Sequence, residues 1–364
     1  MIDILSLPFE TVEKQIADLG YPRYRAKQLF QWLAEGCRNF EEMTNLPKAL
    51  RQLLGERYLL HNPRLLRKQT SAEDGTIKCL WELQDGHSVE TVFMRYHYGN
   101  SVCISSQVGC RQGCAFCAST IGGLVRSLSP GEMYDEVIFT EKAASDRVSN
   151  IVLMGIGEPL DNLENVLAFL HLISREDARN IGLRHITVST CGLPEQMLLL
   201  AAEKLPITLS VSLHAPDDAT RSKIMPSNRG VETVMQACEQ YVRITGRRIS
   251  FEYAMIEGVN DSIVQANLLA AHAKRIGAHV NLIPLNYVEE RGLKTVNDTE
   301  ELEKAVKEVR LSSTQIVSWG DDKDFPIENR LFRMWTIKFE EIYFAENEPL
   351  KDSSFLRQCL SGEK

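Results

Sequence analysis

Short apolar runs alternate with amphipathic stretches along most of the chain after residue 100. The apolar runs, which we interpret as strands, lie at 102–106, 151–154, 185–189, 207–213, 249–255 and 279–284. Helical periodicity occupies the intervals at about 131–146, 161–174, 194–204, 231–245 and 262–276. This alternation predicts parallel βαβ units. Because no dinucleotide-binding glycine motif accompanies the six strands, an α/β fold built on a partial (β/α)6 barrel is favoured over a doubly wound sheet.

The first hundred residues follow different patterns. Residues 1–60 have helical periodicity, with Leu29, Trp32 and Leu33 on one face and Pro47 near the start of another helix. Residues 78–83 and 89–94 alternate around Asp85-Gly86, which predicts a β-hairpin. We therefore divide the chain into a helical N-terminal domain (1–60), a β-hairpin linker (61–100), the barrel (101–290) and a C-terminal region (291–364).

Composition narrows the class of protein. Of 364 residues, 44% are hydrophobic and 25% charged, which is typical of a soluble globular protein. The net charge of -8 predicts no globally basic surface for nucleic acid, although a local basic patch remains compatible with it. The sequence contains no apolar run of membrane-spanning length and no basic leader at Met1. We expect a cytoplasmic protein without a membrane partner, whose thiols stay reduced.

Three of the nine cysteines form a compact motif. Cys110, Cys114 and Cys117 have CxxxCxxC spacing and directly follow the first barrel strand. Three thiolates can hold a cubane iron–sulfur cluster and leave one iron open to another ligand. Zinc is usually bound by two separated ligand pairs, so a zinc site fits less well but remains an alternative. Three inert buried cysteines are the other alternative.

Further polar residues follow the predicted strands. Glu158 lies in a Gly-x-Gly-Glu-Pro run after the second strand, Ser189 follows the third, Ser212 and His214 follow the fourth, and Asn286 follows the sixth. Taken singly, each is compatible with an ordinary turn or structural role. Functional groups of barrels gather at the C-terminal ends of the strands, so their common placement predicts a site there.

The cysteine motif, with Phe116 before its last cysteine, resembles the radical S-adenosylmethionine (SAM) superfamily. From about residue 20 to about residue 290 the chain resembles the RlmN/Cfr family of RNA adenine methyltransferases. Val108 and the run 118–120 resemble the RlmN branch, which methylates carbon 2 of adenine, rather than the Cfr branch, which methylates carbon 8. The motifs that carry the resemblance include Tyr24-Arg25-Ala26-Lys27-Gln28, Val89-Glu90-Thr91-Val92, Gly155-Ile156-Gly157-Glu158-Pro159, Ser212-Leu213-His214-Ala215 and Asn281-Leu282-Ile283-Pro284-Leu285-Asn286.

The resemblance implies a complete set of cofactors and partners. These are a 4Fe-4S cluster, S-adenosylmethionine, 23S ribosomal RNA with transfer RNA as a further substrate, and an electron donor such as flavodoxin or ferredoxin, with the protein acting as a monomer. The cluster ligands would be Cys110, Cys114 and Cys117. The implied cofactor contacts are Gly157, Glu158, Ser189, Ser212, Leu213, His214 and Asn286.

Two residues receive catalytic roles from the resemblance alone. Glu90 would accept a proton from the intermediate, and Cys103 would release the protein–RNA adduct by forming a disulfide. Without the resemblance, we would interpret Glu90 as a surface strand residue and Cys103 as a buried core thiol.

The chain departs from the family near its end. The family carries a methyl-bearing cysteine in an Asp-Ile-x-Ala-Ala-Cys-Gly-Gln-Leu run, which this sequence lacks, and no likeness is found after about Val309. The single late cysteine, Cys359, lacks the flanking motif. Two hypotheses therefore remain beside the methyltransferase: a protein that binds the cluster and cleaves SAM without methylating RNA, and a non-enzymatic RNA-binding or ribosome-assembly protein with a structural cluster.

Overall fold

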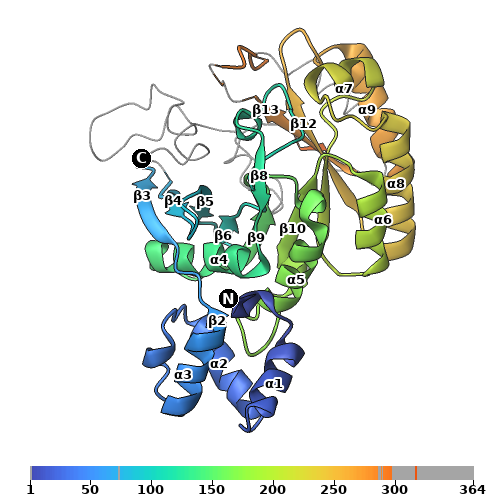
Figure 1. The fold of residues 1–364 in the computed structure, drawn as a ribbon. Helices are drawn as coiled ribbons and strands as arrows, with labels where there is room; N and C mark the ends of the chain where they lie inside the picture. The colour runs from blue at the N-terminus through green and yellow to red at the C-terminus, as the bar shows by residue number, and fades with distance from the viewer. Residues whose placement is uncertain (1, 73, 286–287, 289, 297–315, 318–364) are drawn as a thin grey trace.

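The computed structural model describes residues 2–72, 74–285, 288, 290–296 and 316–317. At the N-terminal end, three helices pack together below the rest of the molecule (Figure 1). They are α1 (Phe9–Asp18), α2 (Tyr24–Ala34) and α3 (Lys48–Arg57), joined by the short parallel pair β1 (Ile2–Asp3) and β2 (Tyr58–Leu59). Leu29 and Leu33 are fully buried in their core, whereas Trp32 is only partly buried against it. The helical periodicity predicted for this segment is therefore observed.

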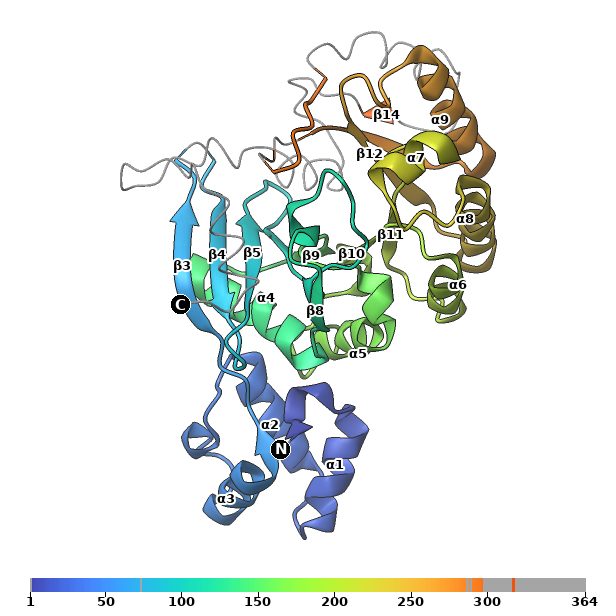
Figure 2. The same ribbon diagram turned by 45° about the horizontal axis from the view of Figure 1, so that its top comes forward.

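A ten-stranded sheet contains the remaining strands of the described chain, except for β7 (Gln107–Gly109) and β8 (Leu124–Ser127), which pair only with each other. Its order is β14-β13-β12-β11-β10-β9-β6-β5-β4-β3, in which β6 and β9 to β14 are parallel and β3 to β5 add antiparallel at one edge. Figure 2 shows β3 to β5 side by side at that edge. The parallel part confirms the predicted partial α/β barrel. The bounds are β3 (Arg64–Thr70), β4 (Ile77–Glu82), β5 (Ser88–Met94), β6 (Ser101–Cys103), β9 (Asn150–Leu153), β10 (Ile186–Thr190), β11 (Thr208–Ser212), β12 (Ile249–Met255), β13 (His279–Pro284) and β14 (Ile316–Val317).

Helices cover the outer face of this sheet (Figures 1 and 2). Outward-facing apolar side chains such as Val188, Leu209 and Phe251 are buried beneath them. Burying these strand faces against helices contributes to the hydrophobic driving force for the fold. The helices of the barrel are α4 (Pro130–Ala144), α5 (Leu163–Ile173), α6 (Pro194–Ala202), α7 (Asp218–Ile224), α8 (Val231–Thr245) and α9 (Ile263–Ile276).

The structure differs from the predicted elements in four places. The run 102–106 was predicted as one strand, but β6 ends at Cys103 because the next residues turn to bond with the loop after β9, as in Ser106 N–H to Ile156 O (2.9 Å). A second hairpin follows, formed by β7 (Gln107–Gly109) and β8 (Leu124–Ser127). Strand β3 and helix α7 were not predicted, because β3 is exposed at six of its seven residues and α7 is too short to show periodicity.

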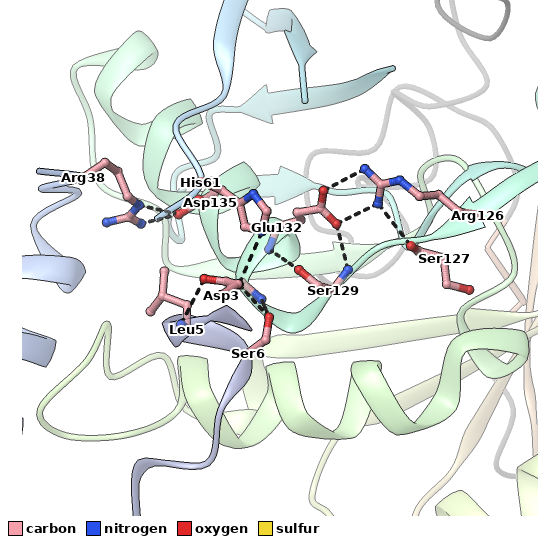
Figure 3. Close-up of polar contacts among 11 residues, drawn as sticks. Asp3, Leu5, Ser6, Arg38, His61, Arg126, Ser127, Ser129, Glu132 and Asp135 are labelled. Carbon is pink, nitrogen blue, oxygen red and sulfur yellow. Dashed lines mark hydrogen bonds and ion pairs between the residues drawn. The ribbon is translucent and has the colours of Figure 1, made fainter. Parts of the chain in front are cut away.

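A buried polar contact joins the N-terminal helices to the barrel (Figure 3). Arg38 pairs with Asp135 of α4, and their side chains are 3% and 2% exposed. Asp3 accepts hydrogen bonds from Leu5 N (3.1 Å) and Ser6 Oγ (2.6 Å), and Ser6 Oγ in turn accepts one from Gly131 N in the first turn of α4. Because α4 also contacts β4 and β5, the N-terminal helices are anchored next to the antiparallel edge of the sheet.

Across the described residues, none of the helices is both long enough and apolar enough to cross a membrane.

Candidate active site

The inner face of the barrel strands is polar, in contrast to their apolar outer face. The pairing register places Ser189 opposite Ser210, Ser212 opposite Glu252, and Glu252 opposite Asn281. Side chains at paired positions share one face of a sheet, so these residues point to the same side, away from the helices. Ser210 Oγ and Asn281 Nδ2 both donate to Glu252 Oε1, at 2.7 and 3.1 Å. The barrel interior is therefore suited to polar ligands.

The three cysteines of the motif lie on the loop between β7 and β8. Gly109 makes this hairpin possible, because its φ is +74° and a Cβ there would lie 1.9 Å from Gly123 O. The loop is fastened by Ala115 N–H to Ile224 O (2.8 Å) and by Thr120 Oγ1 to the carbonyls of Cys114 and Cys117 (3.2 and 3.0 Å). The loop thus presents its three thiols from a fixed backbone.

The chemistry of these thiols fits a cluster. Burial raises the pKa of Cys110 to about 12, and it raises the pKa of Cys114 even further, with the neighbouring motif cysteines and Glu158 adding to the effect. Such thiols lose their protons only when a cation binds them, as iron does. Among the described residues no three His, Cys, Asp or Glu side chains are grouped to hold a single metal ion. Each thiolate of a cubane binds a different iron, so a cluster does not require such a group.

Glu158 is held rigidly at the end of β9. It is 4% exposed, and its carboxylate accepts hydrogen bonds from Leu160 N (3.0 Å) and Cys191 N (2.7 Å). Burial raises the pKa of Glu158, and these backbone bonds oppose the increase. Gly157, with φ +107°, lies against Gln107, whose side chain a Cβ would meet at 2.5 Å. The glycine is therefore required for packing between two loops.

Residues at the ends of β10 and β11 supply the next predicted contacts, and the residue after β10, Cys191, donates to Glu158 Oε2. Ser189 (8% exposed) and Ser212 (half-buried) both belong to the polar inner face described above. Leu213 is fully buried in the core, so only its backbone could approach a ligand. The structure is compatible with cofactor contacts from the two serines, and it makes Leu213 a spacer between Ser212 and His214.

His214 connects the end of β11 with the cysteine loop. Its ring meets Phe116 edge-to-face at 4.8 Å, and its Nδ1 accepts a hydrogen bond from Ala254 N (2.9 Å). Burial, with a smaller contribution from Arg221, lowers the pKa of His214 to about 3, so the ring is neutral with its proton on Nε2. Its backbone is left-handed (φ +53°), which is strained for a residue with a side chain.

Glu90 and Cys103 lie on the same face of neighbouring strands. Cys103 is paired with Val92, and Glu90 is two residues before Val92 on the same side of β5. Side chains at such diagonal positions are about 7–8 Å apart. Cys103 packs with Met94 and Val152 in a small cluster separate from the main core. Both residues therefore face the barrel interior, and Glu90 is not on the outer surface of its strand.

An unexpected partner accompanies Glu90. Lys78 of β4 places Nζ 2.8 Å from Glu90 Oε1, and the two side chains are only 8% and 10% exposed. Lys78 occurs within the alternating pattern of a predicted strand, where an inward lysine has no sequence signal. Gln107 was also missed as a site residue, although its Oε1 accepts from Glu158 N (2.9 Å).

Two predicted residues cannot be placed. Asn286 and Cys359 lie outside the described residues. The eight cysteines that the structure does describe are all in the thiol form, so the transient disulfide expected for Cys103 stays a prediction.

Comparison with known proteins gives independent evidence for the family of this chain. The sequence model of the Radical SAM superfamily matches residues 104–269, and that of the ribosomal RNA large subunit methyltransferase N-terminal domain matches residues 2–60. These two regions correspond to the barrel and to the helical N-terminal part.

Curated relatives cover most of the chain. A protein of Desulforamulus reducens named probable dual-specificity RNA methyltransferase RlmN is 53% identical over 293 residues, covering 80% of this chain and 84% of that protein. A protein of Lachnoclostridium phytofermentans with the same name is 47% identical, covering 88% of this chain and 92% of its own. A crystal structure of a radical SAM methyltransferase from Sphaerobacter thermophilus is similar with a TM-score of 0.80 at 38% identity, covering 87% of this chain and 95% of that one.

Proposed function

Because this chain belongs to the RlmN family of radical SAM RNA methyltransferases, which use a 4Fe-4S cluster and S-adenosylmethionine, we propose that it methylates carbon 2 of an adenosine in 23S ribosomal RNA. The observation that carries this proposal is the placement of Glu90 and Cys103 on one inner face of the sheet. Carbon 2 of adenine has no lone pair to attack a methyl cation, so a radical route is required. Transfer RNA is the second substrate in this proposal, in keeping with the dual specificity in the relatives' names.

The cofactors are held at the mouth of the barrel. Cys110, Cys114 and Cys117 bind the cluster, and Glu158 accepts hydrogen bonds from the ammonium group of SAM. When bound, the cluster and SAM supply the radical that activates an otherwise inert methyl group. Ser189, Ser212, the backbone of Leu213, and His214 line the remainder of the SAM site in this proposal. Asn286, which the resemblance also assigns to SAM, lies outside the described residues. Support comes from the shared strand ends and from the contact between His214 and Phe116 of the cluster loop.

Glu90 and Cys103 complete the reaction on the base. The Glu90 carboxylate accepts the proton that leaves the adenine, and the ion pair with Lys78 holds that carboxylate toward the barrel interior. The radical adduct would lose this proton and return one electron to the cluster. The Cys103 thiolate would then attack the sulfur of a methyl-carrying cysteine, so that an S–S bond forms as the carbon–sulfur bond breaks. The electron pair of the broken bond would stay on the methylene carbon, which takes up a proton and becomes the methyl group of the released base.

The helical N-terminal part handles RNA in this proposal. Arg23, Lys27 and Lys48 are exposed on it, whereas Arg25 and Arg51 are partly engaged with the backbone at Asn45 and Glu41. Exposed cations contact phosphates and recognise RNA through its backbone and shape. An electron donor such as flavodoxin or ferredoxin supplies the reducing electron.

A second candidate rests on a specific observation in the sequence. The Cys-Gly-Gln-Leu run that carries the methyl group in the family does not occur in these 364 residues. Only a thiolate is nucleophilic enough to take the methyl group at neutral pH. In this candidate the protein binds the cluster and cleaves SAM, but does not methylate RNA.

One experiment separates the two candidates. Cluster-loaded protein is incubated anaerobically with a reductant, SAM and a 23S RNA fragment, and digested nucleosides and small products are analysed by mass spectrometry. The proposed function predicts 2-methyladenosine together with 5′-deoxyadenosine, and loss of 2-methyladenosine in Glu90→Gln. Production of 5′-deoxyadenosine with no methylated nucleoside would favour the second candidate, and 8-methyladenosine would contradict the assignment to carbon 2. Loss of product in Cys359→Ala would identify Cys359 as the carrier.

A further inference from the structure

Arg221 is the largest side chain that is fully buried in the described chain. It lies in α7 and is 1% exposed. No ion pair among the described residues includes it, so its positive charge is buried without a carboxylate in contact. Burial lowers the pKa of Arg221, but guanidinium remains charged in proteins. Burying a charge costs desolvation free energy, so a buried charge requires an interaction that compensates for this cost.

The guanidinium is bonded to the ends of two barrel strands. Its Nε donates to Leu213 O (3.0 Å), and its Nη2 donates to Ser212 O (3.2 Å) and Cys191 O (2.5 Å). Its Nη1 donates to Asn228 Oδ1. Four of the five guanidinium N–H groups can thus be assigned to protein acceptors. Arg221 therefore joins the residue after β10 to the residues that end β11.

The same contacts connect Arg221 to the proposed cofactor site. Cys191 is held on both sides, because its N–H donates to Glu158 Oε2 and its C=O accepts from Arg221. One turn after Arg221, Ile224 O accepts from Ala115 N inside the cysteine motif (2.8 Å). Helix α7 thus bonds directly to the loop after β10, the end of β11 and the cluster loop, and it is linked to Glu158 through Cys191.

We propose that Arg221 is a positioning residue that holds the backbone around the SAM site in place without contacting SAM. We further propose that its buried charge stabilises the reduced, more negative state of the cluster. Its burial and its four hydrogen bonds leave it no direct approach to SAM. It acts by fixing the backbone of Cys191 and Ser212 and by placing a cation near thiolate-bound iron in a medium of low dielectric constant. The hydrogen bond from Ala115 N to Ile224 O (2.8 Å), one turn from Arg221, holds α7 against the cysteine loop and supports this placement. The inference rests on the site proposed above.

The two effects can be separated by substitution. Arg221→Gln removes the charge and most of the hydrogen bonds, whereas Arg221→Lys keeps the charge but cannot reach the same set of carbonyls. Arg247→Gln is the matched control, because Arg247 Nε bonds a single carbonyl, Ile207 O, at the opposite end of β11. The readouts are iron and sulfide content, the Kd for SAM by equilibrium dialysis, and the midpoint potential of the cluster by a redox titration followed by electron paramagnetic resonance.

We expect Arg221→Gln to keep its cluster, bind SAM at least tenfold more weakly and show a more negative midpoint potential. Arg221→Lys should keep a potential close to that of the wild type but still bind SAM more weakly, and Arg247→Gln should match the wild type. Wild-type affinity and potential in Arg221→Gln would overturn the inference. If Arg221→Gln fails to fold, Arg221→Lys decides: wild-type affinity for SAM in that variant also overturns it.

A parallel variant shows which proposal has failed. Cys114→Ala should lose the cluster if the site itself is assigned correctly. Loss of the cluster there, combined with unchanged SAM binding and potential in Arg221→Gln, would refute the role of Arg221 alone. A retained cluster in Cys114→Ala would refute the proposed site.

Discussion

Replacing Glu158 by glutamine tests the SAM site with the smallest change in shape. The carboxylate accepts from Cys191 N and Leu160 N, and it would also accept from the ammonium group of SAM. Glutamine keeps one acceptor oxygen and turns an NH₂ group toward one of the two backbone donors. A buried N–H left without an acceptor costs about 1–3 kcal/mol of folding stability.

The effect on binding is separate from the effect on stability. Losing a hydrogen bond between a carboxylate and an ammonium group costs about 1–3 kcal/mol, and about 1.4 kcal/mol corresponds to a tenfold change in Kd. We therefore expect Glu158→Gln to raise the Kd for SAM by roughly 5-fold to 150-fold. The assay is equilibrium dialysis with cluster-loaded protein, accompanied by urea unfolding.

The matched control is Glu164→Gln, because Glu164 is exposed in the first turn of α5. It should leave the Kd for SAM unchanged. If Glu158→Gln retained a full cluster and a folded barrel but bound SAM as tightly as the wild type, Glu158 would be a purely structural turn residue.

Three further predictions concern the surroundings of the site. Cys114→Ala should abolish bound iron and sulfide in anaerobically purified protein, whereas Cys37→Ala, at a partly exposed position, should leave both unchanged; stoichiometric zinc without sulfide would contradict the cluster. Lys78→Met should slow RNA methylation at least tenfold while 5′-deoxyadenosine production continues, because only the Glu90 step depends on the ion pair; equal losses of both products would refute that role. Burial raises the pKa of Glu136 well above its usual value, so above about pH 4.3 the unfolded carboxyl ionises while the folded one stays protonated. The wild type should then lose about 1.4 kcal/mol of stability per pH unit relative to Glu136→Gln until the folded pKa is passed, as measured by urea unfolding; a pH-independent difference would contradict it.

The sequence predicted the barrel well because its strands are buried on their outer face under amphipathic helices. The runs at 249–255 and 279–284 coincide with β12 and β13, and the periodicity at 231–245 coincides with α8. These elements have long, regular patterns. Helix α7 could not be found this way, since seven residues with a buried arginine show neither an apolar stripe nor a repeat.

The candidate site was predictable as a set of motifs but not as a geometry. Spacing and resemblance placed Glu158 and His214 at strand ends, where the structure has them. Gly157 illustrates the limit: the resemblance implies a cofactor contact there, which stays a prediction, whereas its packing against Gln107, fifty residues away in the chain, had no sequence signal. The ion pair of Lys78 with Glu90 depends on strand register, which alternation alone does not specify.

The most direct test of the central claim, a radical SAM centre at the mouth of this barrel, is the formation of 5′-deoxyadenosine. Wild type, Cys114→Ala and Cys37→Ala are taken through the same anaerobic cluster reconstitution and incubated with a reductant and SAM, and the product is quantified by mass spectrometry. The account predicts 5′-deoxyadenosine from the wild type and from Cys37→Ala, and none from Cys114→Ala. Equal production by Cys114→Ala, or none from wild type that carries its full complement of iron, would contradict the account.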